Sequence, residues 1–145
     1  RQALLIQAVI PKMKEKNFGR IINITSAMVK NPHLIMGLST SARSGLHGLS
    51  KALSREVAQY NITINNVLPE RIDTDRQTQI LNFQAKLADS TYEEAKKELE
   101  ETLTAKRMGT VEEFSGICTF LCSEQAAYIS GQNISVDGGN STNLI

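Results

Sequence analysis

This sequence has few aromatic residues and almost no excess of either positive or negative charge. It contains no tryptophan, aromatic residues make up 5% of its 145 residues, and its formal net charge is +1. Proteins that bind single-stranded nucleic acid stack bases on aromatic side chains in a basic groove, so this composition argues against such a partner. No apolar run approaches the roughly 20 residues that span a bilayer. The sequence therefore predicts no nucleic-acid partner and no membrane partner.

Cysteine is rare as well. Cys118 and Cys122 are the only two cysteines, and they lie four residues apart in a helical pattern with no histidine at metal-ligand spacing. This pattern predicts two small buried apolar side chains and neither a metal site nor a disulfide. The N-terminus lacks the basic and then apolar layout of a signal peptide. Together with reduced cysteines, that favours a cytoplasmic location.

What the sequence does contain fits one globular domain. Apolar residues make up 41% and charged residues 21% of the chain, a balance that can bury a core. The chain opens without an initiator methionine, inside the amphipathic segment RQALLIQAVIPKMKEK and without a helix cap. Domains rarely begin in mid-helix, so we interpret the sequence as a piece of a longer protein.

Helical and extended patterns alternate along the chain. Apolar spacing predicts a helix that ends near residues 17–19, with a kink at Pro11, and a long helix over residues 40–60. Strands are predicted over residues 20–25 and 61–69, and a third begins at residue 133 and ends in a turn. A loop over 27–38, a charged helical region over 74–106 and a helix over 110–124 complete the order. The Thr110–Glu113 spacing predicts a capping box for that last helix. Such alternation is typical of an α/β fold with a parallel sheet and right-handed crossovers.

Apolar spacing also predicts which side of each helix is buried. The charged run YEEAKKELEE is expected to be a solvated face. The expected buried stripes are Leu5, Val9 and Met13; Leu46, Leu49, Leu53 and Val57; Ile80, Phe83 and Leu87; and Tyr92, Ala95, Leu99 and Leu103.

Three strand ends carry unusual residues. Ser26 follows the first strand, Pro69 and Thr74 follow the second, and Asp137 follows the third within a VDGG turn. In open α/β sheets, ligands bind beyond the carboxyl ends of the strands, so these residues are expected along one rim. We interpret the Asp-Gly-Gly segment itself as a structural turn.

Five segments, in order, resemble the C-terminal half of a classical short-chain dehydrogenase/reductase, in the branch similar to 3-oxoacyl-acyl-carrier-protein reductase. These segments are GRIINITS, SARSGLHGLSKALSREVA, ITINNVLPERIDT, KRMGTVEEFSGICTFLCSE and YISGQNISVDGG. Together with the spacing between them, they span almost the whole chain. The resemblance implies the C-terminal portion of one Rossmann-type, doubly wound parallel domain. It places the glycine-rich phosphate loop upstream, and it makes residues 74–106 a substrate lid.

The resemblance also implies a catalytic frame. Ser26 matches the serine that hydrogen-bonds the substrate oxygen. Thirteen residues later, where the family has its acid tyrosine, the sequence has Ser39, and four further on Arg43 replaces a lysine. Because a serine hydroxyl is shorter and far less acidic than a phenol, with its pKa of about 10, tyrosine-type acid catalysis is not expected from Ser39. Arg43 can still donate hydrogen bonds to ribose hydroxyls.

Three further residues match the nicotinamide side of the family's cleft. Pro69 matches the proline of a Pro-Gly pair, Glu70 replaces its glycine, and Thr74 matches a threonine that contacts the nicotinamide. Glu70 could accept a hydrogen bond, stabilise the oxidised ring or point to solvent, and Thr74 could instead only cap a helix. The implied cofactor is NAD or NADP.

Two kinds of function remain open from the sequence. One is an oxidoreductase of small carbonyl or alcohol substrates, with a water, His33 or an upstream residue as the acid, whereas His47 is expected to pack or to be exposed. The other is a catalytically silent dinucleotide-binding protein, acting as a sensor, scaffold or heteromeric partner. The resemblance further implies a homodimer or homotetramer.

Overall fold

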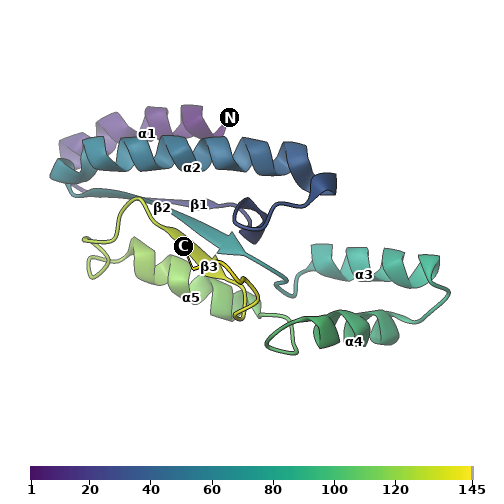
Figure 1. The fold of residues 1–145 in the computed structure, drawn as a ribbon. Coiled ribbons are helices and arrows are strands. Elements are labelled where there is room, and N and C mark those ends of the chain that lie inside the picture. The colour runs from purple at the N-terminus through teal and green to yellow at the C-terminus, as the bar shows by residue number, and fades with distance from the viewer. Residues whose placement is uncertain (145) are drawn as a thin grey trace.

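The computed structural model describes residues 1–144 of the chain (Figure 1). The elements in chain order are α1 Gln2–Lys16, β1 Gly19–Ile24, the short 3-10 helices η1 Ala27–Val29 and η2 Leu34–Met36, α2 Gly37–Val57, the 3-10 helix η3 Ala58–Tyr60, β2 Ile62–Pro69, α3 Asp75–Leu87, α4 Tyr92–Thr102, α5 Val111–Cys122 and β3 Asn133–Val136. The alternating order predicted from the sequence is therefore confirmed.

The three strands form one parallel sheet in the order β1-β2-β3. Gly19 lies opposite Ile62, and Asn66 lies opposite Asn133. Helices α1 and α2 cover one face of the sheet and α5 covers the other (Figure 1). This is the layered α/β architecture of a Rossmann-type sheet, as the sequence predicts.

The face under α1 and α2 holds the first apolar cluster, built from Ile6, Leu46, Val57, Ile62 and Ile64. On α2 the expected stripe is confirmed. On α1 the expected face is confirmed for Met13, which packs on this cluster, and is wrong for Leu5 and Val9, which are 65% and 40% exposed while Ile6 is buried. The helix turns Ile6 towards its neighbours, which spacing alone does not fix. The helix is continuous through Pro11 and ends at Asn17, which adopts the left-handed conformation of a helix cap.

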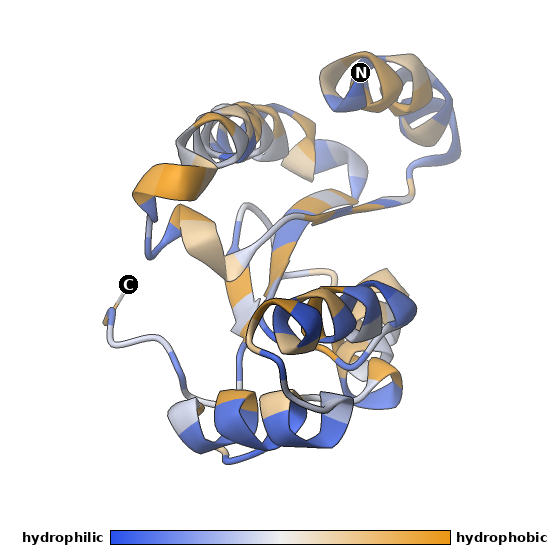
Figure 2. Cartoon of the chain, turned by 90° about the vertical axis from the view of Figure 1, so that its right-hand side faces the viewer, coloured by the Kyte–Doolittle hydropathy of each residue, from blue (hydrophilic) through white to orange (hydrophobic). Residues whose placement is uncertain are grey.

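The opposite face packs on α5. Val67, Leu121 and Ala126 form a buried cluster there, and Thr110 and Glu113 make the predicted capping box. The prediction of two buried cysteines is wrong for Cys122, which is exposed, while Cys118 is partly buried. Leu121 takes the sheet-facing position at the end of α5, which leaves Cys122 pointing away. Hydrophilic and hydrophobic residues alternate around the helices, as expected of elements that bury one side (Figure 2).

Helices α3 and α4 form a hairpin that projects from the sheet (Figure 1). It has its own cluster of Leu81, Leu103 and Met108, against which Tyr92, Ala95 and Leu99 pack, so the second expected stripe is confirmed. The stripe expected on α3 is wrong, since Phe83 and Leu87 are 63% and 74% exposed while Leu81 and Ala85 are buried. The partner of α3 is α4, and that contact decides which side of α3 is covered.

Candidate active site

Ser26 stands at the carboxyl edge of the sheet, two residues after β1 ends. Its side-chain oxygen accepts a hydrogen bond of 3.2 Å from the backbone N–H of Met28 and so caps η1. The residue is half-buried. This capping fixes the position of the hydroxyl at the ligand-binding rim.

Ser39 and Arg43 lie on the first turns of α2. Helix α2 ends at Val57, close to where β2 begins, so its first turns lie towards the carboxyl edge of the sheet. Arg43 Nη1 donates to the Ser39 hydroxyl and, at 3.4 Å, to the Ser39 carbonyl oxygen. The two side chains therefore face the same way, one helical turn apart, as their spacing predicts.

His47, the next helical turn on, is not in the cleft. Its ring is buried, and Nε2 lies 2.8 Å from the hydroxyl of Thr25. Burial, and to a lesser extent the positive charge of Lys30, lower the pKa of His47, which favours the neutral ring. The packing role that the sequence favoured for His47 is therefore what the structure shows. Nearby, the Thr40 hydroxyl is buried and has no hydrogen-bond partner among residues 1–144.

A row of polar side chains beneath α2, buried at Asn23, Ser50 and Asn66 and exposed at Asn133, was not foreseen from the sequence. Asn23 Nδ2 donates to Ser50 Oγ and to Asn66 Oδ1, both at 3.0 Å, and Asn66 Nδ2 donates to Asn133 Oδ1 at 2.8 Å. The row thus crosses all three strands at one register. Asparagine is depleted in strands, so its presence in each predicted strand was the available signal.

Pro69 and Glu70 lie where β2 meets β3. The Glu70 backbone N–H donates to the Val136 carbonyl oxygen at 3.1 Å, and its Oε1 accepts a 2.8 Å bond from Asn140 Nδ2. Glu70 is therefore held by the C-terminal segment and does not simply point to solvent. Thr74 is exposed and caps α3, its side chain accepting from the Gln77 N–H. Thr74 thus performs the capping role that the sequence left open, and its contact with nicotinamide stays a prediction.

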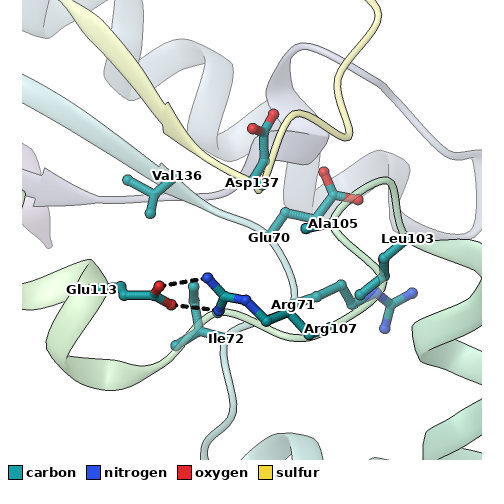
Figure 3. Close-up of a pocket in the computed structure, with 11 residues that line it drawn as sticks. Glu70, Arg71, Ile72, Leu103, Ala105, Arg107, Glu113, Val136 and Asp137 are labelled. Carbon is teal, nitrogen blue, oxygen red and sulfur yellow. Dashed lines mark hydrogen bonds and ion pairs between the residues drawn. The ribbon is translucent and has the colours of Figure 1, made fainter.

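Two cavities meet at Glu70. A cavity of about 230 Å³ lies at the base of the α3–α4 hairpin (Figure 3). There Arg107 forms a two-bond ion pair with Glu113, at 2.8 and 2.6 Å, and together with the N–H of Thr110 it lowers the Glu113 pKa to about 2. A second, more open cavity of about 430 Å³ is lined by Asn31, Pro32, His33, Glu70, Asn140 and Thr142.

The end of β3 is a turn, as expected. Asp137 accepts hydrogen bonds from the backbone N–H groups of Gly139 and Ser141, at 3.0 and 3.2 Å. Its carboxylate is thus used within the turn, which itself helps to line the smaller cavity.

Two absences hold for the described part of the chain. No group of three or more His, Cys, Asp or Glu side chains within residues 1–144 could hold a metal ion. Within the same residues no helix has the length and apolar character to cross a membrane.

A parallel sheet flanked by helices, with polar residues and cavities gathered at its carboxyl edge, defines a Rossmann-type α/β domain. A family model described as "Enoyl-(Acyl carrier protein) reductase" matches residues 2–141. The chain belongs to the short-chain dehydrogenase/reductase family, and the resemblance seen in its motifs is confirmed.

Individual relatives agree with this assignment. The chain is 38% identical to NADPH-dependent reductase BacG of Bacillus subtilis (strain 168), over 88% of this chain and 49% of that protein. It is 35% identical to 3-oxoacyl-[acyl-carrier-protein] reductase FabG of Aquifex aeolicus (strain VF5), over 94% of this chain and 50% of that one.

Solved structures show the same fold. The crystal structure of YwfH, an NADPH-dependent reductase involved in bacilysin biosynthesis, aligns with a TM-score of 0.83 at 36% identity, over 91% of this chain and 50% of that one. L-sorbose reductase from Gluconobacter frateurii, complexed with NADPH and L-sorbose, aligns with a TM-score of 0.88 at 27% identity, over 97% and 54%. The chain spans about half the length of the curated relatives it matches.

Proposed function

We propose that this chain is the C-terminal, catalytic portion of a single-domain NADPH-dependent reductase of the short-chain dehydrogenase/reductase type, acting on a small carbonyl or alcohol substrate. The names of two relatives, an NADPH-dependent reductase and a 3-oxoacyl-carrier-protein reductase, support this activity. The observation that carries it is the Ser39–Arg43 pair on the first turns of α2, thirteen and seventeen residues after Ser26, in the family's spacing.

The residues present fit the nicotinamide end of the cofactor. The Arg43 guanidinium keeps donors beyond its bonds to Ser39, and these can reach ribose hydroxyls. The buried Thr40 hydroxyl lacks a partner among the described residues, which is the state of a polar group that a ligand satisfies. Pro69 and Glu70, held at the end of β2 by Val136 and Asn140, lie at the nicotinamide side in this proposal. A bound nicotinamide would supply hydride transfer.

Within this proposal Ser26 orients the substrate oxygen and Thr74 lies at the nicotinamide side. Residues 74–106, the α3–α4 hairpin, act as the substrate lid. A homodimeric or homotetrameric assembly and a cytoplasmic location belong to the same proposal.

The test uses the complete protein that carries this sequence. NADPH binding is measured by fluorescence titration, and reductase turnover is measured over a panel of small carbonyl compounds. We expect binding and turnover, and we expect Ser26→Ala to abolish turnover while NADPH binding is retained. Ser41→Ala, on an exposed position of α2, is the matched control and should behave as the parent. Binding without turnover across the panel would instead favour a catalytically silent protein, a sensor, scaffold or heteromeric partner.

A further inference from the structure

The larger cavity joins three separate chain segments at the carboxyl edge of the sheet. Asn31, Pro32 and His33 come from the loop after β1, Glu70 from the end of β2, and Asn140 and Thr142 from the segment after β3. The loop that carries His33 also connects Ser26 to Ser39 in sequence. The cavity therefore lies among the loops that the fold devotes to ligand binding.

The cavity walls are tied together by hydrogen bonds. Asn140 Nδ2 holds the Glu70 carboxylate at 2.8 Å. Asn143 Nδ2 donates to the carbonyl oxygen of Lys30 at 2.9 Å and to Asn31 Oδ1 at 2.8 Å. The C-terminal segment is thus hydrogen-bonded both to Glu70 and to the loop that carries His33. These bonds fix the position of one cavity wall relative to the other.

His33 and Glu70 are the titratable side chains that line this cavity. His33 is exposed, and its backbone carbonyl accepts from the Met36 N–H, while its ring makes no hydrogen bond within residues 1–144. Glu70 lines the same cavity, and Lys30 lies three residues earlier in the loop. The ring nitrogens of His33 are therefore available to a ligand in this cavity, and histidine is the side chain that most often serves as a general acid.

Other candidate proton donors are less suited. The Ser39 hydroxyl is shorter and far less acidic than a phenol, and the His47 ring is buried against Thr25. The tyrosines are no better placed. Tyr60 lies beneath Lys14, with the ammonium 4.8 Å from its ring centre; Tyr92 packs in the α3–α4 cluster; and Tyr128 is fully exposed beyond α5.

We infer that His33 is the proton donor that replaces the missing tyrosine, in a cavity that it shares with Glu70. This inference rests on the proposed reductase function. In the step, the carbonyl carbon accepts a hydride from reduced nicotinamide, the carbon–oxygen π pair moves onto oxygen, and the His33 imidazolium N–H gives its proton to that oxygen. The products are the alcohol and the oxidised cofactor. His33, being exposed, regains a proton from water.

The kinetic test is a pH profile of kcat for the parent and for His33→Gln in the complete protein. We expect kcat to fall about 10²–10⁴-fold in the variant, the range of general acid catalysis. The decline of kcat at high pH should also disappear. Leu34→Ala, at an exposed position in the same turn, is the control and should keep both rate and profile. Added imidazole should restore part of the turnover of His33→Ala but not that of Ser26→Ala.

A binding measurement tests the placement without turnover. NADP⁺ is added to the protein, and the ring resonances of the histidines are followed by NMR, His33 being assigned from its loss in His33→Gln. The His33 resonance should shift, and that of buried His47 should stay. If the parent turns over, Ser26→Ala abolishes turnover and His33→Gln keeps the parent rate and profile, the inference is overturned while the reductase function stands. A parent that binds NADPH without turnover overturns both.

Discussion

Arg43 donates hydrogen bonds to both the hydroxyl and the carbonyl oxygen of Ser39, one turn earlier in α2. The pair occupies the two positions at which the family resemblance places a tyrosine and a lysine. The Arg43 guanidinium is therefore oriented by Ser39, which stands at the position of the family's tyrosine. We propose that the frame of the site is kept while its acid chemistry has changed.

Restoring the pair, with Ser39→Tyr and Arg43→Lys together, should raise carbonyl reduction. The expected gain is about 10²–10⁴-fold, because a phenol with a neighbouring ammonium supplies general acid catalysis. The same double substitution should also recover turnover when placed in the His33→Gln background. The measurement is steady-state turnover, with NADPH binding shown to be equal in each variant. Unchanged turnover despite intact binding would move the assignment towards a catalytically silent protein.

The Thr25–His47 pair should make stability depend on pH. The pKa of His47 is lowered in the folded state, so the unfolded chain binds more protons below about pH 6.5. The contribution of the neutral ring is complete above that pH and is lost as pH falls through 6.5 towards the folded value. We expect the free energy of unfolding in urea to decrease from pH 8 to pH 5, and His47→Gln to decrease less. Parallel curves for the two proteins would contradict this origin.

The asparagine row predicts a costly substitution at Asn66. Asn66→Ala leaves one N–H of the buried Asn23 amide without its partner, while the exposed Asn133 can turn to water. An unsatisfied buried polar group costs about 1–3 kcal/mol, so the free energy of unfolding should fall by about that amount. Asn82→Ala, on the exposed side of α3, is the control and should change stability by less than about 0.5 kcal/mol. Equal effects in urea denaturation would show that the row contributes nothing specific.

The α3–α4 hairpin should be the most mobile part of the ligand-free protein. Its helices pack mainly on each other, and its base is held by the bonds from the Asp73 N–H to the Gly109 carbonyl oxygen, 2.8 Å, and from the Gly109 N–H to the Arg71 carbonyl oxygen, 3.0 Å. Elements that close over ligands are drawn from the least stable parts of a fold. Hydrogen exchange should therefore be faster over residues 75–102 than over residues 62–67. Equal protection of the two regions would rule out this behaviour.

The outer side of α1 should contribute to self-association. Leu5 and Val9 are exposed there, although both are apolar. We expect a symmetric homodimer or homotetramer built on α1 and α2, with further contacts around β3. Leu5→Glu should shift the mass measured by light scattering towards smaller species, and Gln79→Glu, on exposed α3, should not. A parent that is monomeric at micromolar concentration would contradict the assembly.

The order of elements and several of their ends were determined by the sequence. Local hydrogen bonds made by nearby residues decide these features, such as the Thr110–Glu113 box that opens α5 and the Asn17 cap that closes α1. The spacing from Ser26 to Ser39 and Arg43 likewise predicted that the Ser39 and Arg43 side chains face the same way, because one helical turn separates these two residues.

The tertiary structure decided which side of each helix is buried and which residues meet at the carboxyl edge of the sheet. Ile6 instead of Leu5, and Leu81 instead of Phe83, face inwards because each helix is rotated by its partner, and an apolar pattern with candidates on both sides leaves that rotation open. The bond between Glu70 and Asn140 joins residues seventy positions apart, and both residues line a cavity together with His33. Such contacts arise only when the parallel strands bring their carboxyl ends to one edge, which no local signal encodes.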